Sequence, residues 1–315
     1  MRQPKIVIVG AGLVGGSAAL FAAVAIPSAE IIIVDLARGH AEGQALDLAH
    51  AAAFWGHNRF YAGDYESARD ADIIVITAGV GVKPGQTRLD LASTNAQVAL
   101  EIVDRTATLA PDAIYLLASN PCDVLAGVVF DRLRCARERV ISTGTSLDTG
   151  RLRSLLSQRL GVEAPAIDAY VLGEHGTSAL IDWSGATVCG MPLEIFLARS
   201  GKELGPASRD RVLRSVHDAR LIKEGKGATH YGIASAIGRI CQAIVHDTDL
   251  ILTVGIVHAE VEGVSEVCVS LPMVVNGRGA HLLAYPDFNA NEREALQGSA
   301  RIVKEATDNV LLTLR

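Results

Sequence analysis

The 315-residue sequence has few aromatic side chains, no excess of positive charge and no long apolar segment. Aromatic residues make up 4% of the chain, so a core must be built mainly from Ala, Val, Ile and Leu. The formal net charge is −6, which argues against broad electrostatic attraction to nucleic acid or to an anionic membrane. Hydrophobic residues are 49% of the chain, and this content excludes intrinsic disorder.

The cysteine pattern and the amino-terminal segment indicate where the protein works. The five cysteines are odd in number and widely spaced, with no Cys-x-x-Cys pair, which disfavours a disulfide framework or a zinc ribbon. The apolar run at residues 6–9 is too short for a signal-peptide core, and the most apolar stretch, residues 18–26, is closed by Pro27. We therefore expect a soluble, cytoplasmic protein with reduced thiols and with no nucleic-acid or membrane partner.

The first half of the chain alternates short β-branched runs with helical stretches. The length suggests roughly two domains of about 150 residues. A single short apolar run is equally compatible with a buried helix segment, but four such runs in regular order indicate βαβ units and a parallel sheet buried on both faces. The predicted strands are residues 6–9, 31–34, 73–77 and 114–117.

The pattern changes near residue 145. We predict helices at residues 151–160, 208–223 and 233–246, short strands at 250–254, 266–271 and 274–275, and a closing helix at 291–312. This mixture is typical of an α+β domain. The fold class is therefore α/β, with a Rossmann-type parallel-sheet domain at residues 1–145 followed by an α+β substrate domain at residues 146–315.

A Gly-x-Gly-x-x-Gly motif directly follows the first predicted strand and opens a helix. Gly10 allows a tight turn, Gly12 lets a pyrophosphate approach the backbone, and Gly15 lets the helix lie close to the strand. Asp35 ends the second strand, where a carboxylate accepts hydrogen bonds from the adenosine ribose and repels a 2′-phosphate. A structural glycine turn is the alternative, but this context favours a dinucleotide site selective for NAD.

Two segments of the second half carry candidate acid–base and anion-binding groups. His175 lies between Gly173 and Gly176 after an apolar run, and histidine is the usual proton shuttle. Asp148 and Arg151 are three residues apart and share a face of a helix. The Arg could hold a carboxylate and the Asp could orient a His, although a turn histidine and an ordinary ion pair are the plainer interpretations.

Two further loops follow predicted strands. Residues 79–91 contain three glycines and a proline beyond the carboxyl end of a strand, where a lid over a ligand crevice is expected. Ser119-Asn120-Pro121 follows the next strand, so Asn120 could hydrogen-bond a ligand. A plain surface loop and a turn are the respective alternatives.

These motifs, with the later segment GKGATHYGIA, resemble the L-lactate/L-malate dehydrogenase family in order and spacing over essentially the whole chain. The resemblance implies NAD as cofactor, a small 2-oxo or 2-hydroxy acid as substrate, no metal, and a homodimer or homotetramer. It implies that His175 is the proton donor and acceptor and that Asp148 pairs with it. The remaining implied roles are carbonyl polarisation by Arg88, carboxylate binding by Arg151, ligand and cofactor contact by Asn120, pocket lining by Thr229, and packing on the nicotinamide by Ile233.

The sequence departs from the family pattern at three positions. Val82 stands where lactate enzymes usually carry Gln and malate enzymes usually carry Arg. Without a cation there, a second substrate carboxylate is poorly compensated, so pyruvate or a larger apolar 2-oxo acid is favoured and malate is the runner-up. Thr177 replaces a usual Asp. Asp168 replaces a His that helps bind fructose 1,6-bisphosphate in allosteric members, although Arg153 matches its partner, so we expect no such activation.

Two other classes remain as alternatives. An NAD- and metal-dependent glycosidase would need a metal site, for which Cys122 is the candidate ligand, but the arginines suited to a 2-oxo acid have no purpose there. A non-catalytic nucleotide-binding protein would have no need to retain His175, Asp148, Arg88 and Arg151 together.

Overall fold

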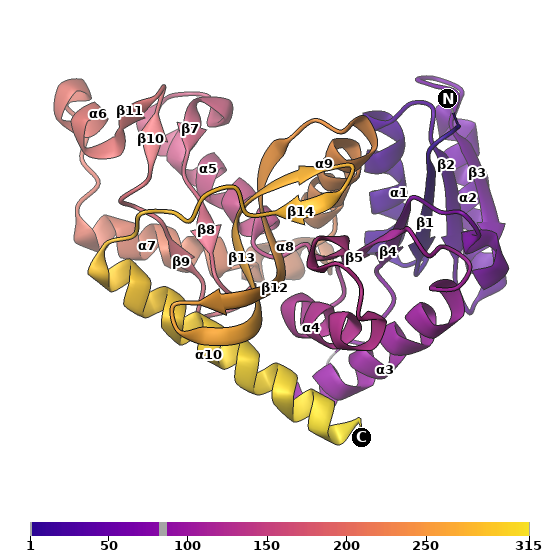
Figure 1. The fold of residues 1–315 in the computed structure, drawn as a ribbon. Coiled ribbons are helices and arrows are strands. Elements are labelled where there is room, and N and C mark those ends of the chain that lie inside the picture. The colour runs from indigo at the N-terminus through magenta and orange to yellow at the C-terminus, as the bar shows by residue number, and fades with distance from the viewer. Residues whose placement is uncertain (1, 82–86, 315) are drawn as a thin grey trace.

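The structure is a computed structural model that describes residues 2–81 and 87–314 (Figure 1). The first half comprises β1 (Lys5–Val9), α1 (Leu13–Ala25), β2 (Glu30–Val34), α2 (Arg38–Ala52), β3 (Arg59–Gly63), a 3-10 turn (Tyr65–Ala68), β4 (Ile73–Ile76), α3 (Arg88–Thr106), β5 (Ile114–Leu117), α4 (Cys122–Leu133), a 3-10 turn (Arg137–Arg139) and β6 (Val140–Ser142). The second half comprises α5 (Ser146–Leu160), a 3-10 turn (Ala164–Ala166), β7 (Ile167–Asp168), β8 (Val171–Leu172), β9 (Leu180–Ile181), β10 (Thr187–Val188), β11 (Met191–Pro192), α6 (Leu193–Ser200), α7 (Pro206–His217), α8 (Arg220–Lys226), α9 (Tyr231–His246), β12 (Leu250–Val261), β13 (Val264–Asn276), β14 (Gly279–His281) and α10 (Ala290–Thr313).

A nine-stranded sheet organises the molecule, in the order β14-β13-β12-β6-β5-β4-β1-β2-β3. Strands β1 to β6 pair in parallel, and β1 lies between β2 and β4. This arrangement confirms the predicted Rossmann-type parallel sheet. Helices α1 and α9 pack against each other, while α3, α4 and the carboxyl-terminal α10 form a second group (Figure 1).

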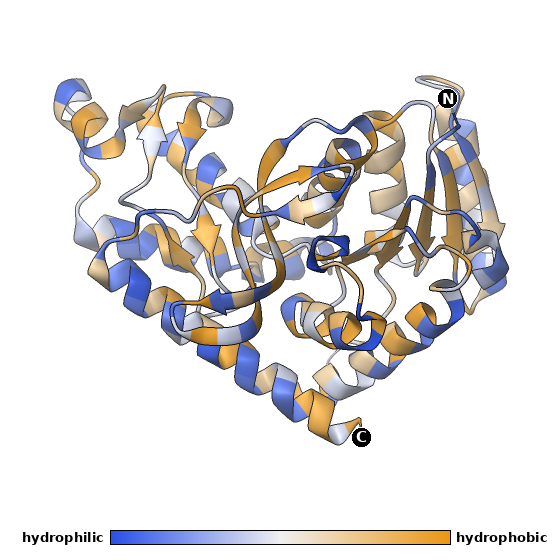
Figure 2. Ribbon diagram, in the orientation of Figure 1, coloured by the Kyte–Doolittle hydropathy of each residue, from blue (hydrophilic) through white to orange (hydrophobic). Residues whose placement is uncertain are grey.

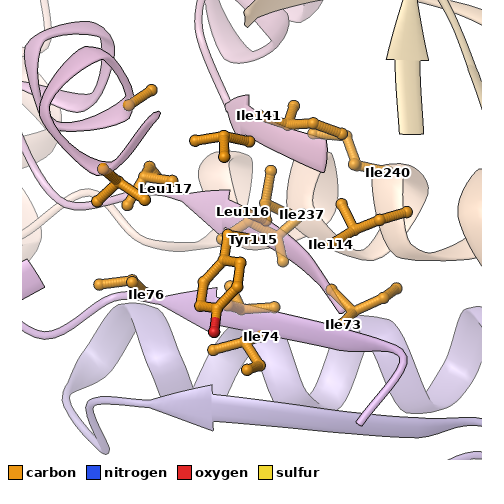
Figure 3. Packing of buried hydrophobic residues seen from close by; sticks show 14 of the residues in the cluster. Ile73, Ile74, Ile76, Ile114, Tyr115, Leu116, Leu117, Ile141, Ile237 and Ile240 are labelled. Atoms are coloured by element: carbon orange, nitrogen blue, oxygen red, sulfur yellow. The ribbon is translucent and has the colours of Figure 1, made fainter. Parts of the chain in front are cut away.

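The core of this sheet is built from β-branched and leucine side chains, as the low aromatic content predicts. In Figure 2 the central strands are the most hydrophobic part of the ribbon. Tyr115 is the one aromatic residue among the largest fully buried side chains, and its hydroxyl hydrogen-bonds with Thr106 Oγ1 at 2.9 Å. Figure 3 shows its neighbours: Ile73, Ile74 and Ile76 of β4, Ile114, Leu116 and Leu117 of β5, Ile141 of β6, and Ile237 and Ile240 of α9.

Two elements of the second half differ from the sequence prediction. The single helix expected at residues 208–223 is wrong: α7 ends at His217, and the Asp218 carboxylate accepts a hydrogen bond from the backbone N–H of Arg220 at the start of α8 (2.8 Å). The short strands expected after residue 250 are two long strands, β12 and β13, that pair along nearly their whole length. Strand β12 also pairs with β6, so the second half extends the sheet of the first.

A second, smaller core lies away from this sheet. Buried leucines of α5 pack there with residues of β7, β10, α6 and α7, including Leu152, Leu156, Leu160, Val188 and Val216. The domain boundary at residue 145 stays a prediction; β6 ends at Ser142 and α5 begins at Ser146. Among the described residues, no helix combines the length and the apolar content needed to cross a membrane.

Candidate active site

A cavity of about 300 Å³ brings together residues that are far apart in the sequence. Its walls come from α1, the β5–α4 turn, α5, the loop after β8, and the segment from α7 to α9. Six of the predicted site residues line it: Asn120, Asp148, Arg151, His175, Thr229 and Ile233. The structure therefore gathers in one place the groups that the sequence motifs singled out separately.

A buried carboxylate connects the candidate acid–base and anion-binding groups. His175 Nδ1 lies 2.6 Å from Asp148 Oδ2, and Arg151 Nη1 donates to Asp148 Oδ1 at 3.1 Å. Asp148 is 3% exposed, and it lies in the first turn of α5. The carboxylate can only accept, so Nδ1–H donates to it and Nε2 is the nitrogen available to a ligand.

The pKa of His175 is raised from its ordinary value. Burial acts to lower the pKa, but the hydrogen bond and the charge of Asp148 outweigh burial, and the charge of Asp123 adds to them. Arg151 opposes these effects only in part. The raised pKa favours the protonated imidazole, which can donate from Nε2.

The loop that carries His175 is fixed through three consecutive backbone N–H groups. Gly173 N donates to Ser270 O (3.0 Å), Glu174 N donates to Ser299 Oγ (2.8 Å), and His175 N donates to Asp123 Oδ2 (2.7 Å). Gly173 has φ +86°, and a Cβ there would lie 2.6 Å from Ser299 Oγ, so only glycine fits. The loop is held by β13, α10 and α4 at once.

The glycine-rich turn after β1 has the geometry of a phosphate site. Gly10 has φ +112°, and a Cβ at Gly15 would come within 1.8 Å of Gly10 O, so both positions require glycine. Gly12 caps the amino terminus of α1, and a Cβ added there meets nothing within 4 Å. This open space, with the N–H groups of the helix terminus, fits a pyrophosphate.

Asp35 lies beside this turn, at the end of β2. Its carboxylate accepts hydrogen bonds from Ala11 N (2.7 Å) and Ala37 N (2.8 Å). It therefore holds the glycine-rich turn against the strand end, in the place where a ribose is expected. Arg38 begins α2 and pairs with Glu42 (2.9 Å) on an exposed surface, as a solvated residue.

Two of the predicted residues are not placed by the structure. Val82 and the side chain of Arg88 lie outside the described residues. The predicted loop at residues 79–91 is wrong at its end, because α3 already begins at Arg88. Thr87 and Asp90 form a reciprocal capping box there, with N–H···O distances of 3.1 and 3.0 Å, and start the helix.

Comparison with known proteins decides the family. Residues 4–142 match the family model for the lactate/malate dehydrogenase NAD-binding domain, and residues 145–312 match that for the lactate/malate dehydrogenase α/β carboxyl-terminal domain. The chain belongs to the lactate/malate dehydrogenase family.

Relatives within this family are similar over nearly their whole length. The L-lactate dehydrogenase of Geotalea daltonii is 43% identical over 97% of this chain and 99% of its own, and that of Thermus aquaticus is 41% identical over 96% and 98%. A solved lactate dehydrogenase from a Medee basin deep-sea metagenome library superposes with a TM-score of 0.92 at 36% identity, covering 98% of this chain and 99% of its own.

The structure of this family member also places residues that the sequence analysis missed. Asp123 supports the His175 loop, while His217 and Lys223 line the same cavity from α7 and α8. Asn95, 2% exposed, donates to the carbonyls of Val80 (3.2 Å) and Asn120 (2.7 Å) and so joins two loops at the strand ends. An acidic residue within the apolar run after Pro121 is unusual, and this could have pointed to Asp123. His217, Lys223 and Asn95 had no such sequence signal.

His217 differs from His175 although both face the same cavity. Its Nε2 is buried and has no hydrogen-bond partner among the described residues. Burial lowers its pKa, and the attraction of Asp148 is opposed by His175 and Arg151. Within this family member, His217 is therefore suited to be neutral.

Proposed function

We propose that the protein is an NAD-dependent L-2-hydroxyacid dehydrogenase of the lactate dehydrogenase type, which interconverts a 2-oxo acid, NADH and a proton with an L-2-hydroxy acid and NAD. The observation that carries this proposal is the 2.6 Å pair of His175 and Asp148 beside Arg151, in a cavity that also contains Asn120 and Ile233. The two L-lactate dehydrogenase relatives and the glycine-rich turn support it.

The side chains around the cavity account for the acid–base part of the reaction. NADH supplies the hydride. Protonated His175 donates from Nε2 to the substrate carbonyl oxygen as negative charge develops there, and Asp148 stabilises the charged imidazole. Arg151 holds the substrate carboxylate through a two-pronged contact and so selects the face that becomes the L product. Arg88 is proposed to polarise the same carbonyl.

The cofactor preference is proposed from Asp35. A carboxylate in hydrogen-bond contact with the glycine-rich turn repels the 2′-phosphate of NADP and accepts hydrogen bonds from the ribose of NAD. We expect KM for NADH to be at least about tenfold lower than for NADPH, which corresponds to roughly 1.4 kcal/mol. Equal use of both cofactors in a steady-state assay would contradict this selectivity.

The substrate preference is proposed from Val82, which supplies no cation to the pocket. We expect pyruvate or a larger apolar 2-oxo acid to exceed oxaloacetate in kcat/KM by at least about tenfold, or roughly 1.4 kcal/mol of transition-state binding. The test is NADH oxidation with pyruvate, 2-oxoisocaproate, phenylpyruvate and oxaloacetate. If oxaloacetate leads, the interpretation of Val82 is wrong.

Malate dehydrogenase activity is the second candidate, and one observation favours it. Lys223 also lines the cavity, so an ammonium group is present there even without a cation at residue 82. An ammonium group near the substrate side chain would compensate a second carboxylate. The same four-substrate comparison separates the two candidates.

The alternatives from other classes have less support. The thiol of Cys122 is 2% exposed, and burial raises its pKa, so it is poorly suited to bind a metal as the glycosidase hypothesis requires. Tight NADH binding without turnover of any 2-oxo acid would support the non-catalytic hypothesis. A homodimer or homotetramer in the cytoplasm stays a prediction, to be checked by sedimentation and by fractionation.

Allosteric activation by fructose 1,6-bisphosphate is not expected. Arg153 forms an ion pair with Asp168 (3.6 Å) and lies over the ring of Tyr170, so its charge is already engaged. An acidic residue at this position also repels phosphate. A several-fold gain in activity at millimolar fructose bisphosphate would contradict this expectation.

A further inference from the structure

The group that fixes the backbone of His175 is ionisable, unlike the groups that fix its two neighbours. Gly173 N and Glu174 N donate to a carbonyl and to a hydroxyl, whereas His175 N donates to the carboxylate of Asp123 at 2.7 Å. Asp123 lies in the first turn of α4, in the half of the chain that carries the nucleotide motif, and it is 3% exposed. A carboxylate in the first half of the chain therefore holds the backbone of His175, the candidate proton donor in the second half.

A carboxylate is a costly choice for this structural contact. Its second oxygen accepts from Ser142 Oγ (2.7 Å), and no Lys or Arg among the described residues forms an ion pair with it. The amino terminus of α4 offsets only part of the unfavourable transfer from water. An Asn would accept the same N–H without burying a charge, so hydrogen bonding alone does not explain Asp123.

We propose that Asp123 is a positioning residue for His175, which fixes the backbone that carries the imidazole and places a second negative charge near it, in addition to that of Asp148. The inference rests on the proposed function, in which His175 is the proton donor. Asp123 contacts His175 only through the backbone N–H, so it acts on the reaction through His175.

The charge on Asp123 can change without a change of geometry. Burial raises the pKa of Asp123 to about 6, while the bonds from His175 N and Ser142 act to lower it. The neutral acid retains both contacts, because its carbonyl oxygen accepts from His175 N and its hydroxyl donates to Ser142 Oγ. Above this pH the carboxylate adds to the stabilisation of protonated His175, and below it that contribution is lost.

Other titratable groups face this pair and stay in place when Asp123 is replaced. They are Asp148 and Arg151 on α5, Glu174 on the same loop, His217 on α7, Cys122 on α4 and Cys268 on β13. The two buried thiols have raised pKa values and stay neutral, and Asp148 remains the direct partner of the imidazole. The charge of Asp123 can therefore be tested separately.

The test is the pH profile of Asp123→Asn, which keeps an acceptor for His175 N and removes the charge. The alkaline limb of kcat/KM for 2-oxo acid reduction reports the loss of the His175 proton, and it should move down by about 0.5 to 1 pH unit. The kcat/KM of the variant should be about three- to tenfold lower than that of the natural protein at pH 8 and within about twofold of it at pH 6.5. Ser142→Ala is the matched control: it removes the other hydrogen bond of the same carboxylate, which should stay ionised at the alkaline pH where the limb is measured.

In Ser142→Ala, the midpoint of the alkaline limb of kcat/KM should stay within about 0.2 pH unit of its value in the natural protein. An unshifted limb in Asp123→Asn, or an equal shift in both variants, overturns the proposal. If Asp123 had a purely structural role, both variants would lose kcat/KM to a similar extent. The loss would then be the same at pH 8 and at pH 6.5.

An NMR titration of the His175 Cε1–H resonance, assigned with His175→Asn, measures the same effect without turnover. Asp123→Asn should lower the midpoint by the same amount. If natural protein reduces no 2-oxo acid but the midpoint still shifts, the proposed function fails and the role of Asp123 stands. If Asp123→Asn does not fold, the titration of the natural protein decides: a second inflection near pH 6 supports the proposal, and a single step contradicts it.

Discussion

Two histidines in one cavity have opposite pKa shifts. Burial acts to lower the pKa of both His175 and His217, yet the net shift is upward for the first and downward for the second. The difference is the partner: Nδ1 of His175 lies 2.6 Å from Asp148, whereas Nε2 of His217 has no partner among the described residues. The hydrogen-bonded carboxylate, rather than burial, accounts for the opposite directions of the two pKa shifts.

The largest expected effect comes from replacing each histidine in turn. His175→Asn should lower kcat/KM for pyruvate by about 1,000-fold, because it removes a general acid. His217→Asn is the matched control from the same cavity and should stay within about fivefold, because its lowered pKa disfavours the protonated imidazole that a general acid requires. Steady-state NADH oxidation measures both. If the two variants lose activity equally, His175 is not the sole proton donor.

Removing the Asp148 carboxylate should lower the pKa of His175, so that both histidines of the cavity would have a lowered pKa. Asp148→Asn should lower kcat/KM by about 100-fold at pH 8. The raised pKa of His175 depends on Asp148, so the alkaline limb should move down by about one pH unit or more. The pH–rate profile measures this shift, and circular dichroism checks the fold. An unchanged profile would show that Asp148 only orients the ring.

The first half of the molecule was largely predictable from the sequence because its signals are local. Four β-branched runs form β1, β2, β4 and β5, and Gly10 and Gly15 occupy positions where a Cβ would clash. Strand β3 was missed because it lies at the sheet edge, where its residues are half-buried or exposed and it has no β-branched residue.

The second half was less predictable because its determinants are contacts between distant segments. The pairing of β12 with β6 and the division of α7 from α8 depend on neighbours that no short window contains. The same holds for Asp123, whose partner is 52 positions away along the chain. The order of the family motifs predicted the candidate residues that line the cavity, whereas the contact of Asp123 with His175 N and the surroundings of His217 needed the fold.

A third histidine extends the comparison from activity to stability. Burial lowers the pKa of His258 to about 4, and its Nε2–H donates to Val269 O at 3.1 Å. In the unfolded chain its pKa returns to near 6.5, so the unfolded state binds more protons between these values. The stability that neutral His258 provides is present above pH 6.5 and is lost as the pH falls. We expect a loss of about 2 kcal/mol between pH 7 and pH 5.

Urea unfolding of the natural protein and of His258→Leu at both pH values measures this contribution. The variant loses a buried hydrogen bond and is less stable at pH 7, but its loss on acidification should be smaller by about 2 kcal/mol. If both proteins lose the same free energy of unfolding between pH 7 and pH 5, groups other than His258 cause the loss of stability in acid.

The smallest expected effect concerns the side of the cavity that carries His217. Lys223 lines the same cavity as this histidine, but Lys223 is exposed, and solvent and salt screen its charge. Lys223→Met should therefore change the ratio of kcat/KM for oxaloacetate to that for pyruvate by no more than about threefold. Lys226→Met is the matched control, since Lys226 lies on the same helix over the ring of Tyr231. If Lys223→Met lowers the ratio tenfold while the control does not, the ammonium contacts the substrate. That result would favour malate dehydrogenase activity, with Lys223 binding the second carboxylate of the substrate while His175 transfers the proton.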